Sequence, residues 1–247
     1  MTGFGLQPPH AHPRLRAMPD SKFHPLDRPV WSALTTRQEK HARGDASRAL
    51  RFDPEIGPFA VAAENTDANL AGFGELIAPG GFLAVFEREH VDAPSGLVTM
   101  AEIPLFQMVT ARINPGPELP GIVALGEDDA PQMRELAGLT QPGPFFSRTH
   151  ELGGFVGIKE NGKLIAMAGQ RLSLPGFTEV SAVCTHADHR GKGMAAALMR
   201  VVGGNIAARG DAMFLHARVT NTNAIALYEK LGFVTRAQML FHMIRRE

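Results

Sequence analysis

Apolar and polar positions repeat with different periods along the chain, and the changes of period predict its elements. After residue 121 the pattern predicts helix, three strands, helix, strand, helix, strand. The first two of these strands form a hairpin over residues 154–174, because Asn161-Gly162 suits the positive φ angles of a tight turn. The remaining predicted elements are a strand at 177–185, a helix ending at 208, a strand at 213–219, a helix at 221–231 and a strand at 239–245.

The first half of the chain has similar but weaker signals. We expect helices over 30–43 and 67–78, and strands over 58–64, 82–87 and 97–111, the last interrupted at Pro104. The densest Pro/Gly stretch of the interior, 114–121, is the best candidate for a domain boundary. We therefore predict three segments: a Pro- and His-rich mobile arm at 1–22, an N-terminal lobe at 23–120 and a C-terminal domain at 121–247.

Composition excludes several classes of protein. The 247 residues contain 25 basic and 25 acidic side chains, which argues against a nucleic-acid partner. A single cysteine, Cys184, excludes a disulfide framework and a multi-cysteine zinc site, and suits a reducing compartment. No apolar run is long enough to span a bilayer, and the N-terminus lacks the apolar core of a signal peptide. We expect a cytoplasmic protein with no membrane partner.

The neutral total conceals an uneven distribution of charge. Residues 1–147 contain 12 basic and 18 acidic side chains, whereas residues 148–247 contain 13 basic and 7 acidic ones. Oppositely charged halves attract each other, which is one interpretation. The other is that the basic second half binds an anionic ligand.

The most specific chemical signal is a strand that leads through a glycine-bearing turn into a helix, over 183–195. Amides in the first turn of a helix have no partner within the helix and lie at its positive end, so they bind phosphate. Gly191 and Gly193 would let the backbone approach a pyrophosphate, and Arg190 and Lys192 would add positive charge. Turns of this kind also occur without a ligand, so the spacing alone does not decide.

Two motifs make the resemblance specific. Residues 190–195, Arg-Gly-Lys-Gly-Met-Ala, resemble the Arg/Gln-x-x-Gly-x-Gly/Ala signature of the GCN5-related N-acetyltransferase (GNAT) superfamily. Residues 221–233 resemble its Asn-x-x-Ala-x-x-x-Tyr-x-x-x-Gly-Phe signature. Segments 143–149 and 154–158 further resemble the FR47-like branch. The resemblance covers about residues 122–247 and implies an α/β fold with a mixed, splayed central sheet flanked by helices. The preceding lobe carries no such motif, and a degenerate GNAT-like lobe is one interpretation of it.

The resemblance implies acetyl-CoA as the acyl donor, with no metal required. The pantetheine arm would lie where two strands splay apart, against the backbone of 183–185, and the pyrophosphate would lie on the turn at 190–195. For Asn223 a plain helix cap is the alternative to a cofactor contact. The cofactor-binding residues implied in this way are Val183, Cys184, Thr185, Arg190, Gly191, Lys192, Gly193, Met194, Ala195, Asn221, Asn223 and Tyr228.

Two residues are candidates for catalysis. Tyr228, the chain's single tyrosine, occupies the position at which the superfamily often protonates the departing CoA thiolate; a core aromatic is the alternative. Glu179 precedes the phosphate turn, and two-residue alternation would place it on one face with Ser181, Val183 and Thr185. A carboxylate there could accept the proton of the attacking amine directly or through water. A solvated glutamate at a strand end is equally compatible with the pattern.

The weaker candidates have ordinary explanations. Cys184 would face away from Glu179, which argues against a covalent acyl-enzyme. His186, Asp188 and His189 could be taken as a metal pair, but they flank the phosphate turn. Arg148 lies in a loop where it could pair with an acceptor carboxylate or be solvated.

The sequence therefore predicts an N-acetyltransferase that joins acetyl-CoA to a small-molecule or peptide amine by direct attack in a ternary complex. The alternatives are an acyltransferase for longer acyl chains and a CoA-binding sensor without turnover. The sequence does not identify the acceptor or the oligomeric state.

Overall fold

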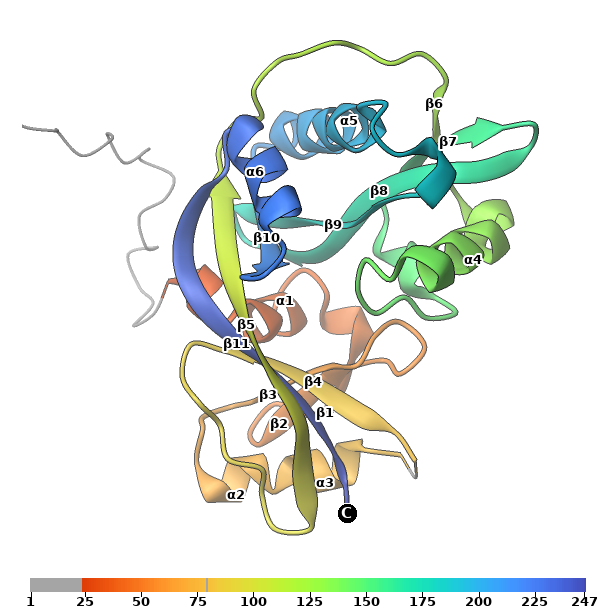
Figure 1. The fold of residues 1–247 in the computed structure, drawn as a ribbon. Helices are drawn as coiled ribbons and strands as arrows, with labels where there is room; N and C mark the ends of the chain where they lie inside the picture. Colours follow the sequence, from red (N-terminus) through yellow and green to blue (C-terminus); the bar gives the residue numbers. More distant parts are fainter. Residues whose placement is uncertain (1–23, 79) are drawn as a thin grey trace, which may run out of the picture.

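The computed structural model describes residues 24–78 and 80–247 and shows an α/β fold built on one mixed sheet (Figure 1). The predicted arm at 1–22 lies outside these residues. No helix in the described part of the chain is long and apolar enough to cross a bilayer. The helices are α1 (Pro29–Leu34), α2 (Asp67–Leu70), α3 (Gly72–Leu76), α4 (Ala130–Thr140), α5 (Met194–Ala208) and α6 (Thr222–Lys230). The strands are β1 (Ala42–Asp45), β2 (Ala49–Phe52), β3 (Phe59–Ala62), β4 (Phe82–Glu87), β5 (Leu97–Thr110), β6 (Ile122–Ala124), β7 (Val156–Glu160), β8 (Lys163–Leu174), β9 (Phe177–Thr185), β10 (Ala212–Arg218) and β11 (Val234–Arg246).

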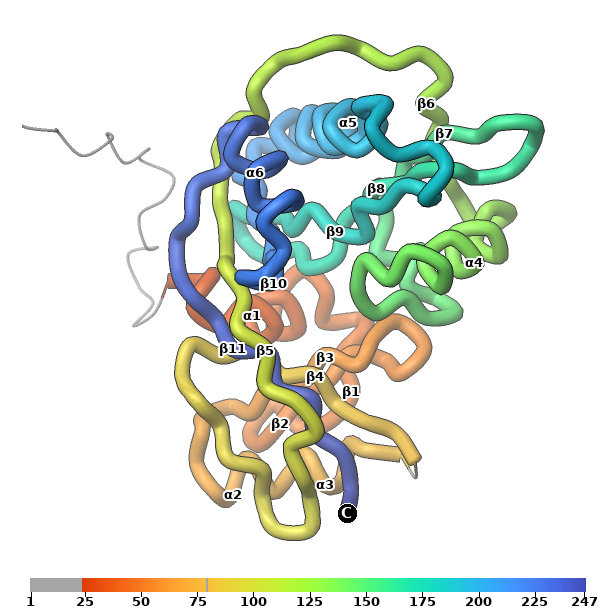
Figure 2. The backbone as a smooth tube through the Cα atoms, viewed as in Figure 1, coloured from red at the N-terminus to blue at the C-terminus, as the bar shows by residue number. Residues whose placement is uncertain are grey.

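The sheet joins the two halves of the chain through its longest strands. The strand order is β1-β2-β3-β4-β11-β5-β10-β9-β8-β7-β6, so the last strand of the chain lies between two strands of the first half. β11 pairs antiparallel with β5 along its whole length and with β4 along its C-terminal half. Figure 2 shows these two strands running together from one end of the molecule to the other. The predicted boundary at 114–121 falls in the connection between β5 and β6, but the sheet continues across it; the division into lobes stays a prediction.

The elements of the second half follow the predicted order, with a short strand, β6, in addition. Asn161 and Gly162 have φ angles of 50° and 77°, so they form the expected tight turn between β7 and β8. Apolar residues of α5 pack on one face of β8, together with Ala166 and Ala168. Those of α4 pack on the opposite face, with Met167. Two-residue alternation along β8 thus buries both faces of the sheet.

Two predictions for the first half are wrong in detail. The helix expected over 30–43 ends at Leu34, and Gln38 beyond it hydrogen-bonds the backbone of β8 at Arg171 and Ser173. These long-range bonds keep the segment out of the α-helix, and Glu39–His41 form a 3₁₀ turn instead. β5 is continuous through Pro104. Its pairing with β10 covers Leu105–Thr110 and does not include Pro104, so the missing N–H of the proline breaks no hydrogen bond to β10.

The face predicted for Glu179 also needs correction, because β9 contains a bulge. Ala182 has a φ of 52°, and the pairing register with β8 shifts at this point. As a result Val180 and Val183 pack with the α5 side of the sheet, whereas Ala182 and Cys184 pack with the α4 side. An extra residue reverses the alternation, so Glu179 does not share one face with Val183 and Thr185.

Candidate active site

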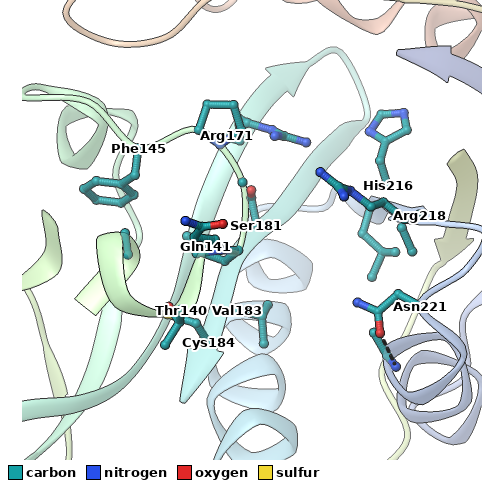
Figure 3. Close-up of a pocket in the computed structure, with 18 of the residues that line it drawn as sticks. Thr140, Gln141, Phe145, Arg171, Ser181, Val183, Cys184, His216, Arg218 and Asn221 are labelled. Carbon is teal, nitrogen blue, oxygen red and sulfur yellow. Dashed lines mark hydrogen bonds between the residues drawn. The ribbon is translucent and has the colours of Figure 1, made fainter. Parts of the chain in front are cut away.

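The centre of the sheet opens where β9 and β10 separate. These two strands are parallel and pair only from Ala212↔Phe177 to Phe214↔Glu179. Beyond these pairs β9 continues to Thr185 and β10 to Arg218 without bonding to each other. In Figure 3 Ser181 and Val183 lie on one side of this gap, and His216, Arg218 and Asn221 lie on the other. The structure confirms the splayed sheet that the sequence predicted.

A cavity of about 1100 Å³ occupies this gap and extends towards the first half of the chain. Its walls include both separated strands, the start of α5 and one side of α6. Seven of the residues predicted from the sequence line it: Val183, Cys184, Thr185, Arg190, Ala195, Asn221 and Tyr228. The other predicted residues do not line it: Glu179, Gly191, Lys192, Gly193, Met194 and Asn223.

The glycine-bearing turn has the backbone conformation that glycine permits. Gly191 and Gly193 have φ angles of 79° and 78°, in the left-handed region that other residues rarely adopt. Gly193 is the N-cap of α5, and no side chain caps this fifteen-residue helix. Lys192 is exposed, and Arg190 donates a hydrogen bond of 3.3 Å to the carbonyl of Thr185. The first amides of α5 therefore lack a side-chain acceptor and lie beside two cations, which favours an anion at this position.

α6 begins at a different asparagine from the one considered first. Asn221 is its N-cap, and its side-chain oxygen accepts a 3.2 Å hydrogen bond from the amide of Ala224. Asn223 lies exposed in the first turn, so the cap assigned to it as an alternative belongs to Asn221.

Tyr228 and Cys184 both keep their protons at neutral pH. Burial raises the pKa of the Tyr228 phenol to about 12, and its ring meets that of Phe233 edge-on at 6.1 Å. Burial likewise raises the pKa of the Cys184 thiol to about 11. A phenol in this state can donate a proton but not accept one, whereas a thiol in this state is a poor nucleophile. Of the two groups that border the cavity, Tyr228 can therefore act as an acid, whereas Cys184 is poorly suited to act as a nucleophile.

Glu179 lies at the point where the two strands separate, and its side chain is fully buried. Arg171 donates two hydrogen bonds to it, of 2.8 and 2.5 Å, and Nδ1 of His216 lies 2.7 Å from Oε1. Burial alone would raise the pKa of Glu179, but Arg171 and His216 outweigh it and hold the pKa at about 2. Glu179 is therefore a permanent anion that fixes Arg171 and His216, both of which line the cavity.

The hydrogen bonds around His216 define its tautomer. Oε1 of Gln107 accepts a hydrogen bond from Arg236, which identifies Nε2 of Gln107 as the amide donor. This donor faces the carbonyl of Leu26 and lies 3.3 Å from Nε2 of His216. Nε2 of the imidazole then accepts, and Nδ1 carries the proton that His216 donates to Glu179. The imidazole is held between two fixed partners on the wall of the cavity.

The end of the cavity nearest the first half of the chain is apolar. Its wall comes from strands that pair across the two halves and consists of Phe82 and Phe86 of β4, Ile103 and Leu105 of β5, and Phe241 and Met243 of β11. Sequence reasoning did not find this wall, nor Arg171, His216 and Arg218. The available signal was the placement of charged or imidazole side chains within otherwise apolar strands.

Arg148 and the His186–His189 pair have local partners. Arg148 hydrogen-bonds Glu151 at 2.6 and 2.8 Å and does not line the cavity. His186 lies 3.7 Å from Asp188 and edge-on to His189, and within the described chain these three form no cluster suited to a metal. Charge attraction between the halves is present as well, since Arg236 pairs with Asp27 at 2.7 Å and Arg37 pairs with Asp211.

Known proteins are similar to this chain in sequence and in fold. The family model of FR47-like proteins matches residues 155–242. A GNAT-family acetyltransferase from Novosphingobium aromaticivorans is 41% identical over 91% of this chain and 100% of its own, with a TM-score of 0.86. A GCN5-related N-acetyltransferase from Kribbella flavida is 18% identical over 86% of this chain and 93% of its own, with a TM-score of 0.59, and shares the fold. No curated protein matches the chain.

A splayed mixed sheet with an uncapped helix start beside the gap is typical of acyltransferases of the GNAT type. The chain belongs to the GNAT superfamily, and its residues 155–242 match the FR47-like family model.

Proposed function

We propose that this protein transfers an acetyl group from acetyl-CoA to an amine by direct attack within a ternary complex. The observation that carries the proposal is the cavity between the separated ends of β9 and β10. The uncapped start of α5 lies at one end of it, where the pyrophosphate would bind. Unpaired backbone groups of residues 183–185 would bond the pantetheine arm, because β10 has moved out of reach.

Tyr228 is the proposed proton donor to the departing thiolate. It borders the cavity on α6, and the raised pKa keeps its phenol protonated at any pH at which the enzyme works. A phenol with a pKa of about 12 is a weaker acid than a thiol, whose ordinary pKa is roughly 8.5, so Tyr228 acts chiefly by donating a hydrogen bond to the negative charge that develops on sulfur as the carbon–sulfur bond breaks. In this mechanism the C–S bond breaks and the amide C–N bond forms. The amine loses one proton to water, the sulfur gains one through the phenol, and the phenol takes its proton back from water.

The proton of the attacking amine leaves through water in our proposal. Direct transfer to Glu179 is opposed by its pKa of about 2 and by the two partners that occupy its oxygens. Glu179 instead positions Arg171 and His216 at the wall that the amine faces. Two-residue alternation along β9 would place Glu179 on the face of Val183 and Thr185, and the bulge at Ala182 is the reason that it does not share their face.

The apolar end of the cavity points to an acceptor amine with an apolar or aromatic body. Six apolar side chains of β4, β5 and β11 line this end. A strongly charged polyamine would be desolvated there without compensation, whereas an aromatic amine would bury apolar surface.

The proposal is tested by measuring free thiol released from acetyl-CoA with a panel of amines. We expect release that depends on an amine, faster with 2-phenylethylamine than with spermidine. No release with any amine while acetyl-CoA still binds would favour the CoA-binding sensor, whereas release that does not depend on an amine would indicate thioester hydrolysis and would contradict transfer to an amine. Faster turnover with longer acyl-CoA donors than with acetyl-CoA would favour the broader acyltransferase.

A further inference from the structure

Three side chains with metal-binding atoms meet on the face of the sheet opposite the cavity. His242 of β11 lies directly across from Glu102 of β5, and His90 follows the end of β4. One potential ligand atom of each lies within 4.8 Å of the others. Their neighbours Ile103, Phe241 and Met243 point to the opposite face, where they form the apolar wall of the cavity. The cluster therefore lies behind that wall and takes no part in the proposed reaction.

The buried histidine of this cluster lacks ordinary hydrogen bonds. The His242 side chain is fully buried, and in the described part of the chain neither ring nitrogen makes a hydrogen bond of ordinary geometry, although the backbone of Glu89 lies near enough to interact with the ring. A buried imidazole whose nitrogens lack good hydrogen bonds destabilises the fold, and a bound metal ion would give one of them a partner. Nδ1 of His242 lies 3.4 Å from Oε2 of Glu102, too poorly aligned for a hydrogen bond. In a tetrahedral zinc site each ligand atom lies about 2.0–2.1 Å from the ion, so two ligand atoms lie roughly 3.3 Å from each other. The separation of Nδ1 from Oε2 matches this value.

The second histidine has the support that metal-bound imidazoles usually have. Nδ1 of His90 faces Oε2 of Glu102 at 2.5 Å, and its Nε2 faces Oδ1 of Asp92 at 3.2 Å. As it stands Nδ1 donates to Oε2 of Glu102, because a carboxylate oxygen only accepts; a bound metal ion would replace this proton and move the two atoms apart, while Nε2 would keep donating to Asp92. A carboxylate that fixes the tautomer of a ligating histidine in this way is a regular feature of zinc sites.

We propose that His90, Glu102 and His242 bind one divalent transition-metal ion, with Zn²⁺ as the preferred ion. Two imidazoles and one carboxylate are a known zinc ligand set that leaves a fourth position for water. The ion would connect β5, β11 and the segment after β4, and so hold together the strands that form the acceptor wall. The site is independent of the proposed acyl transfer.

The test is zinc binding by the full chain after treatment with a chelator. Calorimetry with Zn²⁺ should give one ion per chain, and the ion should raise the melting temperature because it binds the folded state. Co²⁺ should give the intense visible absorption of a four-coordinate ion. Binding in any ratio other than one per chain, or none, overturns the proposal.

Variants separate this site from other histidines. His90→Ala changes an exposed residue and should abolish the one-to-one binding, and Asp92→Asn should weaken it about 10–100-fold. His186→Ala and a His10→Ala/His12→Ala double variant are the matched controls and should bind as the wild type does. Unchanged binding in folded His90→Ala, or loss of binding in either control, would place the ion elsewhere and refute the proposal.

Discussion

The two ends of the cavity are built by different means. The end proposed for the cofactor, here the cofactor end, uses backbone: a glycine-bearing turn, an uncapped helix start and strand edges that have lost their partner. The end proposed for the amine, here the acceptor end, uses apolar side chains of the consecutive strands β4 and β5 and of β11, the last strand of the chain. Binding through the backbone requires particular residues at a fixed spacing, so it produces a motif that can be recognised in the sequence. An apolar wall requires only apolar side chains of suitable volume, so it produces no such motif. The experiments below change one end at a time.

The largest effect is expected from Tyr228→Phe, at the junction of the two ends. General acid catalysis is worth about 10²–10⁴ in rate, so kcat should fall by this factor while the Kd for acetyl-CoA barely changes. The variant keeps the ring that packs edge-on against Phe233 and removes only the hydroxyl, so the melting temperature should stay close to that of the wild type. A wild-type kcat, with chemistry shown to be rate-limiting, would remove the acid role.

Acid should destabilise the protein through Glu179, which stands between the ends. Its pKa of about 2 lies below the ordinary 4.5, so the stabilisation is present above pH 4.5 and is lost as the pH falls towards 2. The shift corresponds to about 3 kcal/mol, as an order of magnitude. Denaturant unfolding across this range checks it. Glu179→Gln should be destabilised at pH 7 and lose this part of the pH dependence, while Glu229→Gln, exposed on α6, should behave as the wild type does.

Ile103→Ala changes the acceptor end alone. The change removes about three methylene-sized groups from the wall, and burying each against an apolar amine is worth about 0.8 kcal/mol. Because the amine would contact these groups only in part, we expect its KM to rise about tenfold. The Kd for acetyl-CoA should not change. A rise in that Kd instead would show that the cofactor, and not the amine, occupies this wall.

Lys192→Glu changes the cofactor end alone and should have the smallest effect. The side chain is exposed, so reversal of its charge should weaken acetyl-CoA binding about fivefold, and the loss should shrink at high salt. Lys163→Glu, also exposed but on the β7–β8 hairpin, is the matched control with unchanged affinity. Equal effects of the two variants would contradict an anion at the 190–195 turn.

The same contrast decides how much the sequence could predict. The turn, Tyr228 and the order of elements after residue 121 follow from local patterns, and Arg190 and Ala195 at the two ends of the turn line one cavity with Tyr228. The face of Glu179 relative to Val183 and Thr185 could not be predicted, because a single extra residue at Ala182 changes the alternation. The apolar wall and the proposed metal cluster depend on the pairing of β11 with β4 and β5, and no local pattern encodes which distant strands pair.

The most direct test of the central claim is the initial rate of thiol release with both acetyl-CoA and the amine varied. Direct attack in one cavity requires both substrates to be bound together, so double-reciprocal plots should intersect. Parallel plots would indicate a covalent acyl-enzyme instead. Cys184, with its pKa raised to about 11, is poorly suited to form one. Parallel plots that persist in Cys184→Ala would contradict the account of this cavity altogether.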